Sequence, residues 1–77
     1  MKKRNISGSR VMQARRSKTI KRKELCKILK SYGVIMNCFS LFLLEHHMRI
    51  VYDFELYFLA KALNTTMDWL LARSDNL

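Results

Sequence analysis

The chain has 77 residues, of which 49% are hydrophobic, and it carries a formal net charge of +9. This length supports one small domain and leaves no room for a catalytic domain with its own cleft. The hydrophobic share argues against disorder over most of the chain, and no apolar run approaches the roughly 18–20 residues that a membrane span requires.

The charge is concentrated in the first part of the chain. Residues 1–30 contain twelve lysines and arginines and one acidic residue, a balance of +11. Residues 31–77 contain three basic and five acidic residues, a balance of −2. A run of charge is often only a solvated face, but an imbalance of this size favours a polyanionic partner.

Residue usage also restricts the fold class and the compartment. There is no proline and there are only two glycines, which favours an all-α fold of helices joined by short turns. The basic start is not followed by the apolar segment of a signal peptide, so a cytoplasmic protein is expected. In that compartment Cys26 and Cys38 are expected to be free thiols rather than a disulfide.

The first predicted elements are a basic arm and a helix. Residues 1–8 are polar and basic, and we expect them to form a flexible arm. A helix is predicted from about Ser9 to Ser17. Three apolar residues are candidates for its inner side: Val11, Ala14 and, before the helix, Ile6.

The second predicted helix starts near Lys21 or Arg22 and ends before Gly33. Glycine adopts the left-handed conformation freely, which suits the end of a helix. The inward-facing residues recur at helical spacing and are Leu25, Cys26 and Leu29.

The third predicted helix spans Cys38 to about His46. Asn37 is a favourable N-cap for it. Leu41 and Leu44 lie three positions apart, so both are expected to face the core.

The last part of the chain predicts two more helices. One begins near Asp53, whose carboxylate suits a helix N-terminus, and its inner stripe consists of Leu56, Leu59, Ala60 and Leu63. Thr66 is expected to cap a short final helix in which Trp69 and Leu70 pack back onto the core. Residues 74–77 are expected to form a short polar tail.

Four stretches resemble the Cro/repressor-type helix-turn-helix domains, often called the Xre family: RVMQARRSK, RKELCKIL, SLFLLE and LAKALNTTMDWLL. The resemblance covers roughly residues 6–73 and is most specific in the C-terminal half. It implies a compact five-helix bundle like that of the lambda repressor, with a helix-turn-helix inside a domain over residues 9–73. It also implies a sequence-specific, nucleoid-associated regulator of repressor type that binds double-stranded DNA in a bacterium or phage. No cofactor is expected.

The resemblance assigns roles to particular residues. In this family the start of the second helix contacts phosphate, the third helix faces base edges in the major groove, and a basic residue after it touches the DNA backbone. The residues at or beside these positions are Lys21, Arg22, Asn37, Cys38, Phe39, Ser40, Leu43 and Arg49. The resemblance further implies a partly buried ion pair between Arg15 and Glu45, which would tie the first helix to the third.

The third helix departs from the family pattern. Cys38, Phe39 and Leu43 stand where members usually carry polar residues, and His47 stands where a glycine usually follows the helix. Histidine tolerates positive φ better than most residues. Phe39, Phe42 and Leu43 form an apolar patch at i, i+3 and i+4 that cannot donate a hydrogen bond to a base.

Three interpretations of this patch remain open. It reads T-rich sites through thymine methyl groups, or it binds a protein or a second copy of the chain. In the third interpretation the helix register differs from the predicted one, or the longer link lets the third helix pack more deeply. The second interpretation is the alternative function: a protein-interaction module on a helix-turn-helix fold. Dimerisation is expected through the C-terminal helix or through the patch, and the two-fold symmetry of such a dimer would be matched by its DNA sites.

Other classes of function are disfavoured. A cationic membrane-surface binder would need its apolar residues exposed, whereas here they fit a core. The adjacent His46 and His47 point about 100° apart on a helix, so no metal site is predicted. The sequence shows no glycine-rich phosphate loop and no nucleophile with a base and an orienting group, so no enzyme is predicted.

Overall fold

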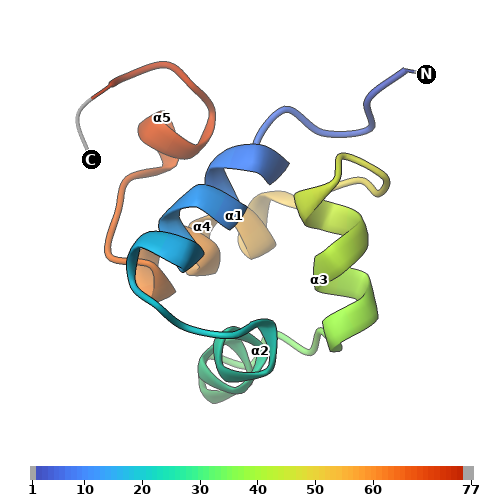
Figure 1. Ribbon diagram of the computed structural model, residues 1–77, viewed down its shortest axis with the longest axis vertical. Helices are drawn as coiled ribbons and strands as arrows, with labels where there is room; N and C mark the ends of the chain where they lie inside the picture. The colour runs from blue at the N-terminus through green and yellow to red at the C-terminus, as the bar shows by residue number, and fades with distance from the viewer. Residues whose placement is uncertain (1, 76–77) are drawn as a thin grey trace.

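Five helices joined by short turns make up residues 2–75 of the computed structural model, and no strand occurs among them (Figure 1). The all-α fold class predicted from the sequence is therefore confirmed. The helix boundaries agree with the predicted ones to within about one residue. The helices are α1 (Gly8–Ser17), α2 (Arg22–Ser31), α3 (Cys38–Glu45), α4 (Asp53–Ala62) and α5 (Met67–Leu70).

The core is built mainly from leucines that all helices except α1 supply, with Val11 and Ala14 contributed by α1. The largest fully buried side chains include Leu25, Leu29, Leu41, Leu44, Leu59, Leu63 and Leu70. The spacing of these leucines predicts that they face inward. Cys26 packs beside them and is half-buried. None of the helices described is long and apolar enough to cross a bilayer.

Local side chains define several helix ends, as the sequence predicts. The Asn37 side-chain oxygen accepts a hydrogen bond from the Ser40 N–H at 2.7 Å, and the Thr66 hydroxyl accepts one from the Trp69 N–H at 3.0 Å. Gly33 follows α2 with φ 88°, and His47 follows α3 with φ 62°. His47 therefore adopts a left-handed backbone conformation, which histidine tolerates better than most residues.

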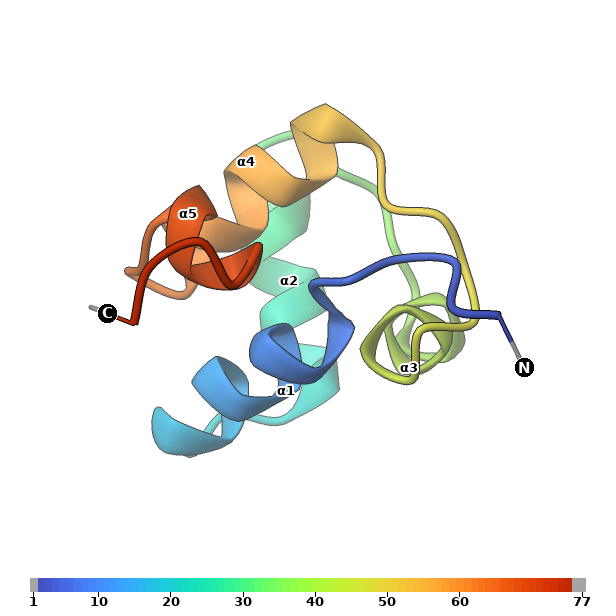
Figure 2. The same ribbon diagram turned by 90° about the horizontal axis from the view of Figure 1, so that it is seen from above.

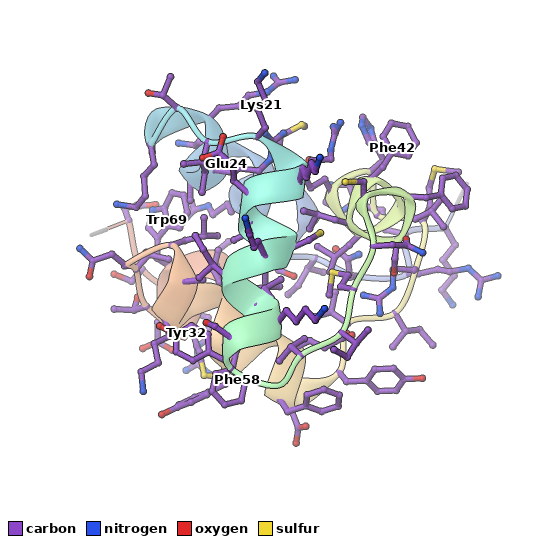
Figure 3. The ribbon with its side chains drawn as sticks, turned by 90° about the horizontal axis from the view of Figure 1, so that it is seen from below. Lys21, Glu24, Tyr32, Phe42, Phe58 and Trp69 are labelled. Carbon is purple, nitrogen blue, oxygen red and sulfur yellow. The ribbon has the colours of Figure 1, made fainter. Side chains whose placement is uncertain are left out.

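The link between α2 and α3 is anchored rather than loose. Val34 and Met36 are buried beneath it, while Ile35 between them is exposed. At the end of α2 the rings of Tyr32 and Phe58 stack with their centroids 5.3 Å apart, which ties α2 to α4 (Figure 3). These contacts place the start of α3 beside the middle of α2.

Part of the N-terminal segment, which the sequence predicts to be a flexible arm over residues 1–8, contacts the end of α3. The Arg4 N–H donates to the His47 carbonyl at 3.0 Å, and the Asn5 side-chain amide donates to the carbonyls of Leu44 at 3.1 Å and Arg49 at 2.8 Å. Figure 2 shows this segment running along the turn between α3 and α4. It is therefore held across the end of α3.

The turn into α1 also corrects a core prediction. Ile6 was expected to face inward, and this is wrong because the side chain is 65% exposed. Ser7 is buried in its place, and α1 begins at Gly8. An added Cβ on Gly8 would collide with the Leu44 carbonyl oxygen, so only glycine allows α1 to approach the end of α3 this closely.

Arg10 fastens the C-terminal segment to α1. Its guanidinium donates to the carbonyls of Trp69 and Ser74, both at 2.9 Å, and lies 4.8 Å from the centroid of the Trp69 ring. Of the polar tail predicted over residues 74–77, only Ser74 and Asp75 are described. Residues 1, 76 and 77 lie outside the described residues.

Candidate nucleic-acid interface

Helix α3 lies at one edge of the molecule (Figures 1 and 2), where it packs against α1 and α2. Leu41 and Leu44 are fully buried beneath it, and the side chains on its opposite side reach the surface. The residues from Cys38 to Glu45 therefore form a helix with one buried and one outer side, as the sequence predicts.

The buried side of α3 ends in a charged network. Glu45 is 1% exposed and accepts two hydrogen bonds from Arg15, with Nε–Oε2 at 2.7 Å and Nη2–Oε1 at 3.2 Å. Arg22 adds a third, with Nε–Oε1 at 2.9 Å. The Arg15–Glu45 pair is the one that the resemblance implies, whereas the participation of Arg22 was missed. A single carboxylate thus connects α1, α2 and α3.

Arg22 also contacts the outer side of α3. Its guanidinium lies 5.2 Å from the centroid of the Phe42 ring, and the same ring lies 4.4 Å from the His46 ring. Within residues 2–75 no hydrogen bond engages its two terminal nitrogens. Arg22 can therefore contact a phosphate through these nitrogens while Glu45 holds its Nε, as the resemblance implies for the first residue of α2.

Arg49, the other arginine expected at DNA, is engaged more completely. Its two terminal nitrogens donate to the two carboxylate oxygens of Glu55 at 3.1 and 2.8 Å. Glu55 is buried in the first turn of α4 and also accepts the Tyr52 N–H at 3.1 Å. A phosphate would have to compete with Glu55 for the terminal nitrogens of Arg49, which already hold the loop onto α4. The geometry therefore favours a structural role for Arg49.

The apolar patch predicted on α3 is present, but its members differ in exposure. Phe39 is 68% exposed, Phe42 is 37% exposed, and Leu43 is half-buried. The rings of Phe39 and Phe42 stack with their centroids 6.5 Å apart. The patch is therefore centred on Phe39, and Leu43 contributes little to it.

The polar residues at the start of α3 have limited hydrogen-bonding capacity for bases. The side-chain oxygen of Asn37 is engaged in capping the helix, which leaves its amide nitrogen free to donate. Cys38 is exposed, and Ser40 is half-buried. Base recognition through this surface would rest on few donors.

Three lysines on α2 add a basic stripe, which the sequence alone did not assign to a site. Lys23, Lys27 and Lys30 line a groove of about 390 Å³ whose floor contains Cys26 and Met36 and which extends to Asn37. No ion pair within residues 2–75 involves any of the three lysines. Their spacing of four and three residues already placed them on one face, but only the path of the link brings that face next to α3.

The start of α2 completes this basic surface. Lys21 is exposed directly before the helix, and its backbone N–H donates to the Glu24 carboxylate at 3.4 Å. Figure 3 shows Lys21 at the start of α2 and Phe42 projecting from the neighbouring α3, with the Tyr32–Phe58 pair at the opposite end of α2. The cations and the rings therefore occupy adjoining parts of one surface.

The remaining candidates for chemistry do not assemble into a site. Both cysteines are free thiols. The Nδ1 of His47 lies 2.9 Å from the Asn5 carbonyl, so this histidine belongs to the turn. Across residues 2–75, no three side chains of the kinds that bind metals come together.

Comparison of the chain with protein-family models, with curated proteins and with solved structures finds no match. The functional assignment therefore rests on the residues and geometry of α2 and α3.

Proposed function

We propose that this chain is a double-stranded DNA-binding protein of the Cro/repressor type, in which α2 and α3 form a helix-turn-helix within a bundle like that of the lambda repressor. The observation that carries the proposal is the construction of α3. The helix is fixed from beneath by two leucines and the Glu45 network, while its outer side is open beside an unpaired lysine stripe.

In this proposal the phosphate contacts supply most of the affinity. Lys21 and the free nitrogens of Arg22 meet the backbone at the start of α2, where the N–H groups of the helix also favour an anion. The stripe of Lys23, Lys27 and Lys30 extends this contact along α2. Each neutralised phosphate releases condensed counterions, so affinity falls steeply as salt rises.

Base reading would come from α3 in the major groove. In this proposal Phe39 contacts thymine methyl groups, and the Asn37 amide and the Ser40 hydroxyl are the nearby hydrogen-bonding groups. Apolar contacts discriminate less than a bidentate pair from arginine or glutamine. We therefore propose a preference for T-containing sites rather than a strict operator code. Such a protein would regulate transcription by occupying its site.

A second candidate function is favoured by one observation, the exposure of the stacked Phe39 and Phe42 rings. Exposed apolar patches on small proteins mark interaction surfaces, so this patch would bind a protein partner or a second copy of the chain. In that case the fold is retained while α3 docks onto a protein instead of DNA.

Fluorescence anisotropy of a labelled duplex, titrated at several salt concentrations, tests the proposal. Replacing Lys27 by alanine should weaken binding and lower the slope of log affinity against log salt by about one. The matched control is Lys61→Ala, since Lys61 lies on α4 over the rings of Tyr32 and Tyr57. Equal effects of the two variants would contradict a specific α2 contact.

The same experiment separates the two candidate functions. A weak response that does not change with salt contradicts DNA binding. If the chain then also self-associates on a sizing column in a salt-insensitive way, and Phe39→Ala abolishes that association, the protein-interaction function is supported.

A further inference from the structure

The outer side of α4 carries exposed aromatic side chains that neither the core nor the proposed DNA surface uses. Tyr52, directly before the helix, Phe54 and Tyr57 are between 49% and 57% exposed. The rings of Tyr52 and Phe54 stack with their centroids 5.9 Å apart. Figure 2 shows α4 along one edge of the molecule and α3 along another. A group of exposed rings on a small protein marks an interaction surface.

Two charged residues lie at opposite ends of this surface. Asp53 is the first residue of α4, and Lys61 is exposed in its last turn, with Tyr57 midway between them. Their spacing of four residues places all three on one side of the helix. Neither Asp53 nor Lys61 forms an ion pair within residues 2–75. The stripe therefore runs from an acid through an aromatic centre to a base.

This order of residues is complementary to itself when two copies of α4 lie antiparallel. In a two-fold pair centred on Tyr57, a residue four positions before the centre lies level with the residue four positions after it on the other helix. Asp53 is then level with the partner's Lys61, and the symmetry repeats this pair. Phe54, three positions before the centre, is level with the partner's Ala60.

A groove beside Tyr57 lies at the level that Phe54 would reach. It has a volume of about 270 Å³ and is lined by Tyr57, Ala60, Lys61, Thr65 and Met67. A ring that packs against this groove removes apolar surface of both copies from water, which favours association. One register of the two helices therefore pairs both charges and gives the exposed Phe54 ring an apolar contact.

The distribution of charge favours a second copy of the chain as the partner of this face. The lysine stripe of α2 has no counter-charge among residues 2–75, so two copies repel one another there. The outer side of α4 carries one exposed charge of each sign, so it repels neither a second copy nor itself and gives DNA no net attraction.

We propose that the chain forms a two-fold dimer through antiparallel contact between α4 and the α4 of a second copy. This surface differs from the two that the sequence suggests for dimerisation, the C-terminal helix and the apolar patch on α3. The dimer does not depend on the proposed function. One helix per protomer is at the small end of protein interfaces, so we expect a dissociation constant of about 10 µM or weaker. Duplex titrations at lower protein concentrations, including those with Lys61→Ala, therefore report on the monomer.

Sedimentation equilibrium of the full chain without DNA, at concentrations up to about 500 µM, tests the proposal. The wild type should change from monomer to dimer as its concentration rises. Tyr57→Ala should weaken the dimer about tenfold or more, because Tyr57 lies at the centre of the contact. Phe39→Ala, on the α3 patch, is the control and should leave the dimer unchanged. A wild type that stays monomeric throughout, or a dimer that Tyr57→Ala leaves intact, overturns the proposal.

Exchange of the two charges tests the antiparallel register. Asp53→Lys and Lys61→Asp each place like charges opposite one another and should weaken the dimer about fivefold or more, since the symmetry repeats each pair. The double variant restores opposite charges, so its dissociation constant should return to within about twofold of the wild-type value. Circular dichroism checks that each variant keeps its helices. Single variants without effect, or a double variant as weak as the single ones, overturn the proposed contact.

Discussion

The inner side of α3 buries a charged residue, whereas its outer side exposes an aromatic one. This is the reverse of the usual arrangement in a surface helix. Its inner side carries Glu45, which is 1% exposed and bound by two arginines. Its outer side carries Phe39, which is 68% exposed and stacks on the Phe42 ring. A charge is usually exposed and a phenylalanine usually buried. Whether a side chain of this helix is buried therefore depends on the bonding partners around it, not on its polarity alone.

The inner network fixes position more than it adds stability. Removing charges from water costs free energy, and even a well-aligned buried ion pair does little more than offset that cost. Buried ion pairs are therefore weak evidence for stability. Three hydrogen bonds nevertheless hold Glu45 against Arg15 and Arg22. The network thus determines where the end of α3 lies relative to α1 and α2, and hence how its outer side is presented.

The largest expected effect comes from breaking the inner side. Glu45→Ala leaves Arg15 buried without a counter-charge, and we expect the free energy of unfolding to fall by about 3–5 kcal/mol. Urea denaturation followed by circular dichroism measures this change. Arg15→Met should destabilise the chain by a similar mechanism, and an unchanged melting temperature for that variant would contradict the network. Asp75→Ala is the control, because the Arg10–Asp75 pair is exposed and should contribute nothing measurable.

Gly8→Ala tests the close approach of α1 to the end of α3, and we expect this variant to be less stable than the wild type. The new methyl group meets the Leu44 carbonyl oxygen, which cannot retreat easily because the Asn5 amide and the Glu45 network hold the end of α3. Overpacking of this kind costs about 1–3 kcal/mol.

Gly33→Ala is the matched control for Gly8→Ala. At Gly33 nothing lies within 4 Å of an added Cβ, and only the positive φ of 88° is unfavourable. This strain should cost about 1 kcal/mol. Thermal unfolding of both variants decides the comparison, and a greater loss for Gly33→Ala would show that α1 and α3 can separate without penalty.

Truncating a side chain on the outer side of α3 should leave the free energy of unfolding almost unchanged. Phe39→Ala removes a side chain that is mostly in water, so the free energy of unfolding should change by no more than about 0.5 kcal/mol. Leu41→Ala on the inner side of the same helix should cost about 2–5 kcal/mol. If Phe39→Ala is instead strongly destabilising, the outer side is part of the core and cannot serve as a free binding surface.

The last prediction concerns a buried polar atom that, unlike the Glu45 carboxylate, has no hydrogen-bond partner among residues 2–75. This atom is the Thr65 hydroxyl oxygen. Thr65→Val replaces it by a methyl group of similar shape, so the chain should be unchanged or stabilised by up to about 1 kcal/mol. A clear loss of stability in denaturant unfolding would indicate that the hydroxyl has a partner in solution.

Much of the fold follows from local sequence signals. The periodic leucines predict the inner sides of α2, α3 and α4, and Asn37 and Thr66 cap the helices that follow them. These features depend on residues three or four positions apart, so the sequence alone is sufficient to predict them. The Arg15–Glu45 contact required the resemblance, because nothing local relates two residues on different helices.

The features that the sequence did not predict all depend on the path of a connecting segment. Asn5 reaches carbonyls beyond α3, Arg49 turns onto Glu55, and the α2 lysine stripe meets Asn37 across the anchored link. Each of these contacts joins segments whose relative placement is set by packing in three dimensions.

The central claim is that the outer side of α3 and the neighbouring face of α2 form one binding surface for DNA. An amide NMR titration of isotope-labelled protein with a duplex at low salt tests this claim most directly. The account predicts that shift changes concentrate in residues 21–30 and 37–43 and disappear as salt is added. Changes confined to α4 and α5, or no changes at all, would contradict it.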